Sequence, residues 1–389
     1  MHSTRNWLIT AVLMLSIISL AQGQSVIIQK GINLPKDSLL KERLINSLNG
    51  FLAQVDQPAS KNDFVLKEEL LATSALLDEM KGMRQNVTLK DNDFFKCYLN
   101  NVVMLDENNF ILQLSYTGIN ENGPLLRSVF RIMAKQENDR FYFYSPLKNN
   151  TVTWKTRQIK HTTYHFKDSL FTACVNEYEK YLALYNSKLN IPSTTSEFYY
   201  CDNFPEVLQV LGIDYKYNYN GSKSNQLSAR ENNRDLLVNG WTSNPYRFDP
   251  HDMWHDRLRV VLSADIINRP VDEGCAYLYG GSWGLSWEQI LATFKAYVAN
   301  NPNADWQTQY TDLKNFSEGN QPLKVAYVIN ALIIKKIEQE KGFQAVLALL
   351  GCGKKENGDA NYFAALEKIG GVKKKDFNGY VEKLIKAAF

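Results

Sequence analysis

Cysteine is scarce in this sequence, with five among 389 residues. Five cysteines are too few for a disulfide-based scaffold, and their odd number leaves at least one thiol unpaired within a monomer. No pairing follows from their positions. We expect Cys275 to be a small core residue, because it lies in a stretch with helical spacing.

An excess of charge of either sign is also missing. The chain has 44 lysines and arginines against 41 aspartates and glutamates, a net charge of +3. This balance gives no general attraction to nucleic acid or to a membrane surface, so we expect no nucleic-acid partner. The sequence also lacks tandem repeats and a glycine-rich phosphate loop with lysine, and no Ser/His/Asp arrangement competes with the metal motif described below.

The N-terminus predicts a secretory signal peptide over residues 1–23. Arg5 precedes an apolar run at 7–20, and small residues follow at the cleavage positions within 21–23. A membrane anchor is the alternative, but the apolar run is short for a span and polar residues follow it directly. We therefore expect a secreted or periplasmic protein that starts at Gln24 and has no integral membrane span.

Residues 24–167 predict an α+β domain. Helical spacing of apolar residues over 39–83 gives way to the period of two that is typical of strands. The predicted strands are 97–105, 109–117, 125–135, 140–144 and 151–166. Helices on one face of such an antiparallel sheet are similar to cystatin-like or nuclear-transport-factor-like domains, which implies a folding or positioning module without its own chemistry.

Residues 168–389 predict a second domain whose C-terminal half is mainly helical. An amphipathic helix is expected over 168–189. Ser286 and Gln289 have the spacing of a capping box, which predicts a helix start, and Gly342 is expected to end a later long helix. Short strands are predicted at 198–201, 215–219 and 235–238.

The chemically most informative stretch contains two histidines. Asp249 is a good N-cap and Pro250 suits the first helical position, which predicts a helix that starts here. Histidines four apart on a helix share one face, so His251 and His255 can hold one metal ion. Glu273 follows His255 by 18 residues in a second helical segment. The three residues form a His2Glu set that leaves one coordination position for water, as catalytic zinc sites do.

His-x-x-x-His followed by Glu-Gly-x-Ala resembles the gluzincin metallopeptidases, the thermolysin-like and aminopeptidase-like group. The resemblance covers residues 168–389 and implies one Zn²⁺ held by His251, His255 and Glu273. It also implies that a metal-activated water hydrolyses peptide bonds of a peptide or protein substrate. In this family a strand upstream of the zinc helix pairs with the peptide backbone at the edge of a sheet, and residues 236–238 occupy that place.

The family pattern has glutamate as general base after the first histidine, whereas this chain has Asp252. Aspartate keeps the carboxylate but shortens its reach by about 1.5 Å. Metal binding is therefore better supported than catalysis, and two functions stay open. One is a zinc peptidase with Asp252 as base, and the other is a pseudo-peptidase that binds peptide or glycan. Tyr327 is either the phenol that stabilises the oxyanion in this family or a core aromatic residue.

A second His-x-x-x-His stretch provides a comparison within the same chain. His161 and His165 lie in a β-branched and aromatic segment that predicts a strand. Four residues of strand span roughly 13 Å, so one ion could not contact both rings. For His251 and His255, a helix pair without metal remains the alternative to a present or ancestral zinc site.

Overall fold

The computed structural model describes residues 25–192, 194–220, 225–241, 248–319 and 321–389. The predicted signal peptide therefore lies outside the described residues. The chain is a mixed α/β protein with two sheets and a helical C-terminal half, as the sequence predicts at this level. In the part of the chain that the structure describes, no helix has the length and apolar character that a membrane crossing requires.

The chain divides into two compact units that alternate along the sequence. The first comprises Met1–Ser169 and Thr194–Trp241, and the second comprises Leu170–Ser193 and Thr242–Phe389. The sequence analysis assigned everything after residue 167 to the second domain. Thr194–Trp241 belongs to the first unit because its strands pair with earlier strands of that unit.

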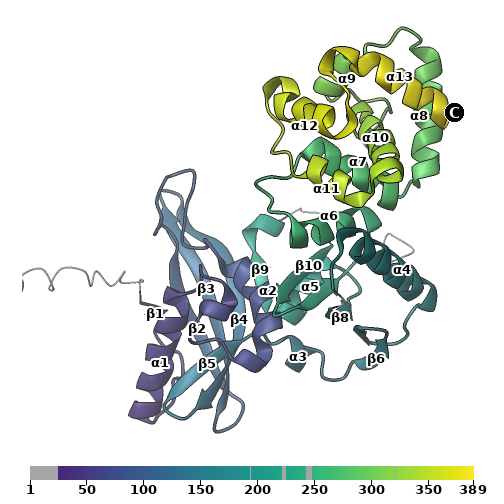
Figure 1. The fold of residues 1–389 in the computed structure, drawn as a ribbon. Helices are drawn as coiled ribbons and strands as arrows, with labels where there is room; N and C mark the ends of the chain where they lie inside the picture. Colours follow the sequence, from purple (N-terminus) through teal and green to yellow (C-terminus); the bar gives the residue numbers. More distant parts are fainter. Residues whose placement is uncertain (1–24, 193, 221–224, 242–247, 320) are drawn as a thin grey trace, which may run out of the picture. The chain divides into compact units, whose positions relative to one another are not determined.

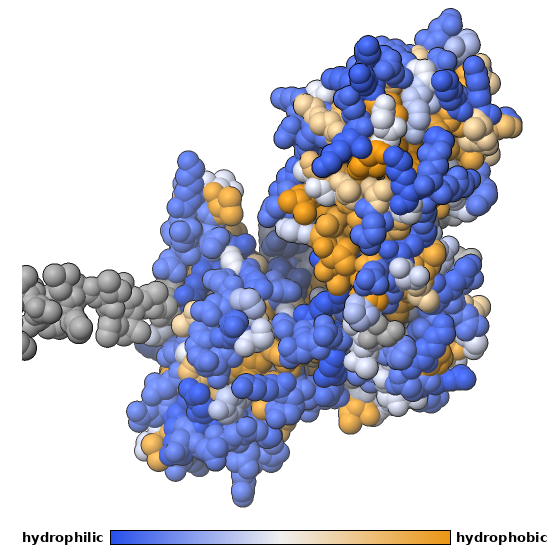
Figure 2. All heavy atoms as spheres, in the orientation of Figure 1, coloured by the Kyte–Doolittle hydropathy of each residue, from blue (hydrophilic) through white to orange (hydrophobic). Residues whose placement is uncertain are grey.

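The first sheet contains the antiparallel meander that the strand pattern predicts. Its order is β1-β2-β3-β4-β5, and β9 pairs with β4. Helix α1 packs against β5, and the apolar side chains of α1, α2 and these strands share one core (Figure 1). Over this part of the molecule the face drawn in Figure 2 is mostly hydrophilic. The elements are β1 Ile27–Ile28, α1 Ser38–Ala53, α2 Leu70–Met80, β2 Lys96–Met104, β3 Asn109–Asn120, β4 Gly123–Glu137, β5 Arg140–Tyr144, α3 Leu147–Asn150 and β9 Ile213–Lys216.

The second sheet corrects two predictions. The strand expected over 151–166 is a hairpin, which turns at Lys160 and His161 and belongs to this second sheet rather than to the meander. The sheet order is β10-β11-β8-β7-β6, so residues 236–238 lie in an interior strand between β10 and β8 and not at an edge. The elements are β6 Lys155–Ile159, β7 Thr162–Phe166, β8 Thr195–Tyr200, α5 Phe204–Leu211, β10 Gln226–Glu231 and β11 Arg234–Asn239.

The second unit is helical and is built around α10. This helix contacts α7, α8, α9, α11 and α13, and it lies among the green and yellow helices of Figure 1. The predicted capping box is present, because Ser286 and Gln289 cap the start of α8 reciprocally. Gly342 ends α10 as predicted. The helices are α4 Thr172–Leu189, α6 Pro250–Val261, α7 Arg269–Gly280, α8 Trp287–Asn300, α9 Trp306–Thr311, α10 Val325–Lys341, α11 Phe343–Leu350, α12 Ala360–Gly370 and α13 Phe377–Ala388.

Two glycines of α7 permit the close packing that positions the candidate site. A Cβ atom on Gly274 would lie 2.6 Å from Cβ of Asn330 on α10. A Cβ on Gly280 would lie 2.8 Å from the carbonyl of Pro250, at the start of α6. Both contacts are too short for a real side chain, so glycine is needed where α7 meets α10 and α6. Trp254 and Leu258 of α6 are completely buried, which fixes the rotation of this helix.

Candidate metal centre

The two histidines lie in the first turns of α6, on one face. Asp249 caps the helix, and its Oδ1 accepts a hydrogen bond of 2.9 Å from the backbone N–H of His251. Pro250 occupies the first turn, as predicted. The rings of His251 and His255 have centroids 4.8 Å apart at an interplanar angle of 78°. The helix start that the sequence predicts therefore holds both imidazoles close enough for one ion.

Glu273 reaches the same point from α7. The candidate ligand atoms of His251, His255 and Glu273 all lie within 4.8 Å of one another. His251 Nε2 and Glu273 Oε2 are 3.5 Å apart. Two atoms that each coordinate a tetrahedral zinc at about 2.0–2.1 Å are roughly 3.3 Å apart. The distance between His251 and Glu273 is therefore close to that of two zinc ligands, and the three residues could hold a metal ion. No comparable group of three occurs elsewhere in the described ranges.

The second nitrogen of each imidazole is held by an acceptor. His251 Nδ1 lies 2.8 Å from the carbonyl oxygen of Gly281, and His255 Nδ1 lies 2.9 Å from Oδ1 of Asp272. Both partners accept hydrogen bonds, so both Nδ1 atoms carry the proton and donate it. This tautomer leaves the lone pair of Nε2 for a metal in each ring. Outer acceptors of this kind orient metal-binding histidines and increase their basicity.

Asp272 also connects the site to the core. Its Oδ1 accepts a second hydrogen bond, 3.0 Å long, from the indole N–H of Trp254, and its side chain is buried. The residue patterns of the sequence did not single out Asp272. Its position next to Glu273, at the start of the third-ligand helix, is the signal that could have identified it. Gly281 acts through its backbone carbonyl, which no residue pattern reveals.

Without a metal, the surroundings of the site favour the charged forms of His251 and Glu273. Burial alone lowers the pKa of His251, but hydrogen bonds to Glu273 and to the Gly281 carbonyl outweigh burial and raise it above the ordinary value of 6.5. Burial likewise raises the pKa of Glu273, yet His251, His255 and Arg269 together hold it below its usual value. A second proton on His251 would sit on Nε2, the atom that would bind a metal, so protonation and metal binding compete there.

Asp252 lies on the first turn of α6, between the two histidines in sequence, and is exposed. The pKa of the N-cap residue Asp249 is raised mainly by burial. The nearby negative charge of Asp252 raises the same pKa further. Asp252 does not belong to the converging group of candidate ligand atoms.

Tyr327 lies on α10 and is buried. Its ring packs edge-on against Tyr277 with centroids 5.5 Å apart. Its phenol pairs with Arg269, and Arg269 in turn forms an ion pair of 3.1 Å with Oε1 of Glu273. Tyr327 is therefore both packed in the core and linked to the site through Arg269. The sequence analysis missed Arg269, although its spacing of four residues from Glu273 on one helix is a usable signal.

The second histidine pair is not assembled into a site. His161 lies in the turn between β6 and β7, whereas His165 lies in β7. The Nε2 atom of His165 is 2.5 Å from Oε2 of Glu197, and its ring stacks on Tyr199 at 4.0 Å. The expectation that both histidines lie in one strand is therefore wrong for His161, which lies in the turn of the hairpin.

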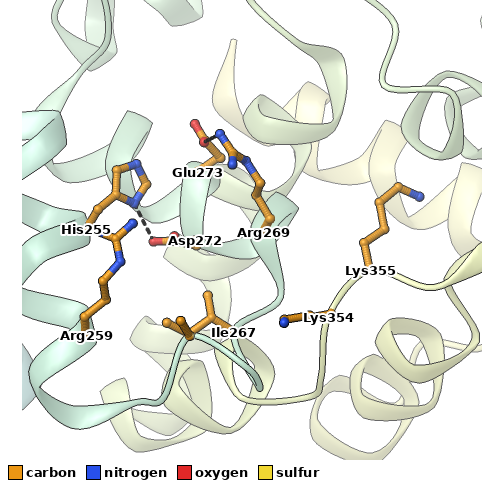
Figure 3. Close-up of a pocket in the computed structure, with 9 residues that line it drawn as sticks. His255, Arg259, Ile267, Arg269, Asp272, Glu273, Lys354 and Lys355 are labelled. Atoms are coloured by element: carbon orange, nitrogen blue, oxygen red, sulfur yellow. Dashed lines mark hydrogen bonds and ion pairs between the residues drawn. The ribbon is translucent and has the colours of Figure 1, made fainter. Parts of the chain in front are cut away.

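A cavity of about 390 Å³ opens beside the metal centre (Figure 3). His255, Asp272 and Glu273 form part of its wall, and Arg269 extends along it toward Glu273. The volume is within the range of small-ligand pockets. Two of the three candidate ligands, His255 and Glu273, therefore line a space that a small ligand can enter.

Comparison with known proteins adds no relative. No protein-family model matches the chain, and no curated protein matches it. The functional argument consequently depends on the geometry of the site.

Proposed function

We propose that the protein is a secreted, zinc-dependent peptidase whose second unit is gluzincin-like. The observation that carries this proposal is the hydrogen bonding of the two imidazoles. Both Nδ1 atoms donate to fixed acceptors, and Nε2 of His251 is directed toward a buried glutamate. Such an arrangement favours a metal ion that all three side chains share over independent functions of His251, His255 and Glu273. A protein or peptide is the proposed substrate.

The residues have distinct roles in this proposal. His251, His255 and Glu273 bind one Zn²⁺, and Asp272 and Gly281 orient the imidazoles. When bound, the zinc would acidify a water and polarise the scissile carbonyl. Asp252 accepts the proton that the attacking water loses, and it passes this proton to the leaving amine. Arg269, held by Tyr327 and Glu273, provides positive charge at the wall of the cavity.

The first unit is assigned no catalytic role. Its helices and antiparallel meander support a cystatin-like module. We assign this module a positioning role, because the converging His, Cys, Asp and Glu ligand atoms found in the described residues all belong to the second unit. The predicted signal peptide supports a location outside the cytoplasm, either secreted or periplasmic.

The alternative is a pseudo-peptidase that binds peptide or glycan without turnover. One observation favours it: the base position holds the shorter aspartate, and this side chain is exposed. Proton transfer requires a base within about 2.6–3.2 Å of the proton donor, directly or through one water. A base that is one methylene too short reaches this distance only if the water moves toward it.

Replacement of the base separates the two functions. Asp252→Glu restores the methylene, so hydrolysis of an unstructured peptide should rise by the ~10²–10⁴-fold associated with a well-placed general base. Asp252→Asn should abolish hydrolysis and leave the zinc content unchanged. Asp312→Glu is the control, because it lengthens another exposed aspartate of the second unit. A zinc-loaded Asp252→Glu protein without activity would favour the binding protein.

A further inference from the structure

The cavity beside the metal centre has an unusual charge distribution. Its wall contains four cationic side chains and only two carboxylates, those of Asp272 and Glu273. Both carboxylates are already engaged, Asp272 by Trp254 and His255 and Glu273 by His251 and Arg269. A metal ion would add further positive charge. The cations are Arg259, Arg269, Lys354 and Lys355 (Figure 3).

Two of the four cations have structural partners. Nζ of Lys355 lies 2.7 and 2.8 Å from the two carboxylate oxygens of Asp359, whose side chain is almost completely buried. Separating this pair would leave a buried charge unpaired, which is costly. Arg269 pairs with Glu273 and Tyr327. We therefore assign Lys355 and Arg269 to the scaffold of the cavity.

The other two cations are available to a ligand. Arg259 is 3.3 Å from Asp256, and Lys354 is 2.9 Å from Asp265. Both cations and both aspartates are largely exposed, with side-chain exposures of 57% and 45% for the first pair and 65% and 83% for the second. Exposed ion pairs contribute little stability, so they exchange readily for another anion. The cavity thus has two exposed cations, Arg259 and Lys354, in the same wall as His255 and Glu273.

We propose that this cavity is a subsite for a carboxylate of the peptide substrate, bound by Arg259 and Lys354. The inference rests on the proposed function for the nature of the substrate. The carboxylate is either the free C-terminus of the peptide or the side chain of an acidic residue. Arg259 follows His255 by one helical turn, so an anion held there lies within one or two residues of the bond next to the metal. Ile267 provides an apolar wall for the rest of the residue.

Calorimetric titration of the metal-free protein tests the subsite independently of hydrolysis. Acetylated trialanine with a free C-terminus is compared with its C-terminal amide. A second pair of amidated tripeptides differs only in a central glutamate or glutamine. Charge-assisted hydrogen bonds should make at least one acid bind about tenfold more tightly than its neutral partner. Preference in the first pair identifies the C-terminal carboxylate, and preference in the second pair identifies an acidic side chain.

Three variants connect this preference to the cavity. Arg259→Gln and Lys354→Gln should each reduce the preference for the acid, and the double variant should remove it. Lys336→Gln is the control, because it removes another exposed lysine of the second unit that is paired with a glutamate. Equal binding of acid and amide in the native protein, or a preference that survives in the double variant, would overturn the subsite. The zinc content is measured separately, so a protein without zinc that still prefers acids contradicts only the proposed peptidase.

Discussion

The chain contains the same His-x-x-x-His spacing in two places, and in the described residues only the pair on α6 converges with a third candidate ligand. On α6 the two rings lie 4.8 Å apart and face Glu273. In the hairpin of the second sheet, the first histidine lies in a turn and the second lies in a strand. The helix returns every fourth residue to one face, whereas an extended segment carries it away. Spacing is informative only together with the backbone conformation.

The two places differ also in which ring nitrogen is occupied. His165 uses Nε2 to contact Glu197. His251 and His255 use Nδ1 for the Gly281 carbonyl and Asp272, which leaves both Nε2 atoms for the site. The neighbouring carboxylate therefore contacts a different ring nitrogen in the two regions. At β7 the carboxylate contacts Nε2, whereas at α6 the Asp272 carboxylate contacts Nδ1 and leaves Nε2 accessible to a metal.

Removal of the histidines should give the largest difference between the regions. His251→Ala or His255→Ala should abolish stoichiometric zinc binding and lower the thermal stability of the zinc-loaded protein. Metal at a hundred times its Kd contributes about 2.7 kcal/mol to the folded state. His161→Ala and His165→Ala should leave the zinc content unchanged. Equal zinc loss in both pairs, measured by elemental analysis, would refute the distinction.

Removal of the neighbouring carboxylate should have an intermediate effect. Asp272→Asn removes the charge that supports His255, so zinc affinity should fall by the ~10–100-fold typical of outer partners of metal ligands. Glu197→Gln is the matched change beside His165 and should not alter zinc affinity. Competition with a chromogenic chelator measures both. An unchanged affinity in Asp272→Asn would show that Asp272 serves only Trp254.

Acidification by one pH unit should have the smallest effect, and its sign follows from the raised pKa of His251. The proton and the metal compete for Nε2, so zinc affinity should fall about tenfold per pH unit below this pKa.

In the metal-free protein the same group acts in the opposite direction. The folded-state pKa lies above the unfolded value near 6.5, so the His251–Glu273 pair stabilises the fold at low pH and loses this effect as pH rises through the folded-state pKa.

Chelator competition from pH 7.5 to 5.5 and thermal unfolding of the metal-free protein measure the two directions. A zinc affinity that does not depend on pH would contradict the competition between a proton and zinc for Nε2 of His251. The His165 ring, which lies outside the centre, should not affect zinc affinity at any pH in this interval.

The sequence predicts local features of this protein well. Asp249 and Pro250 mark the start of α6, Ser286 and Gln289 mark the start of α8, and the meander strands are found close to their predicted bounds. These features are encoded by neighbouring residues, such as a cap, a proline or an alternation of apolar side chains. The histidine face of α6 belongs to the same class.

Features that depend on distant contacts were not predictable. The turn at Lys160 lacks glycine, proline and asparagine, so the hairpin reads as one strand, although Lys160 adopts a positive φ of 50°. Residues 236–238 lie inside a sheet because the polar strand β10 covers them. The Gly281 carbonyl reaches His251 only because Gly280 lets two helices meet. In each case the deciding partner is remote or is a backbone atom.

The zinc content of the protein, purified without chelator, tests the candidate metal centre most directly. Three converging ligands predict about one zinc per chain, bound in the native protein and in His161→Ala and absent from His255→Ala. Less than about a tenth of an equivalent in the native protein, under conditions where added zinc is also not retained, would contradict the account.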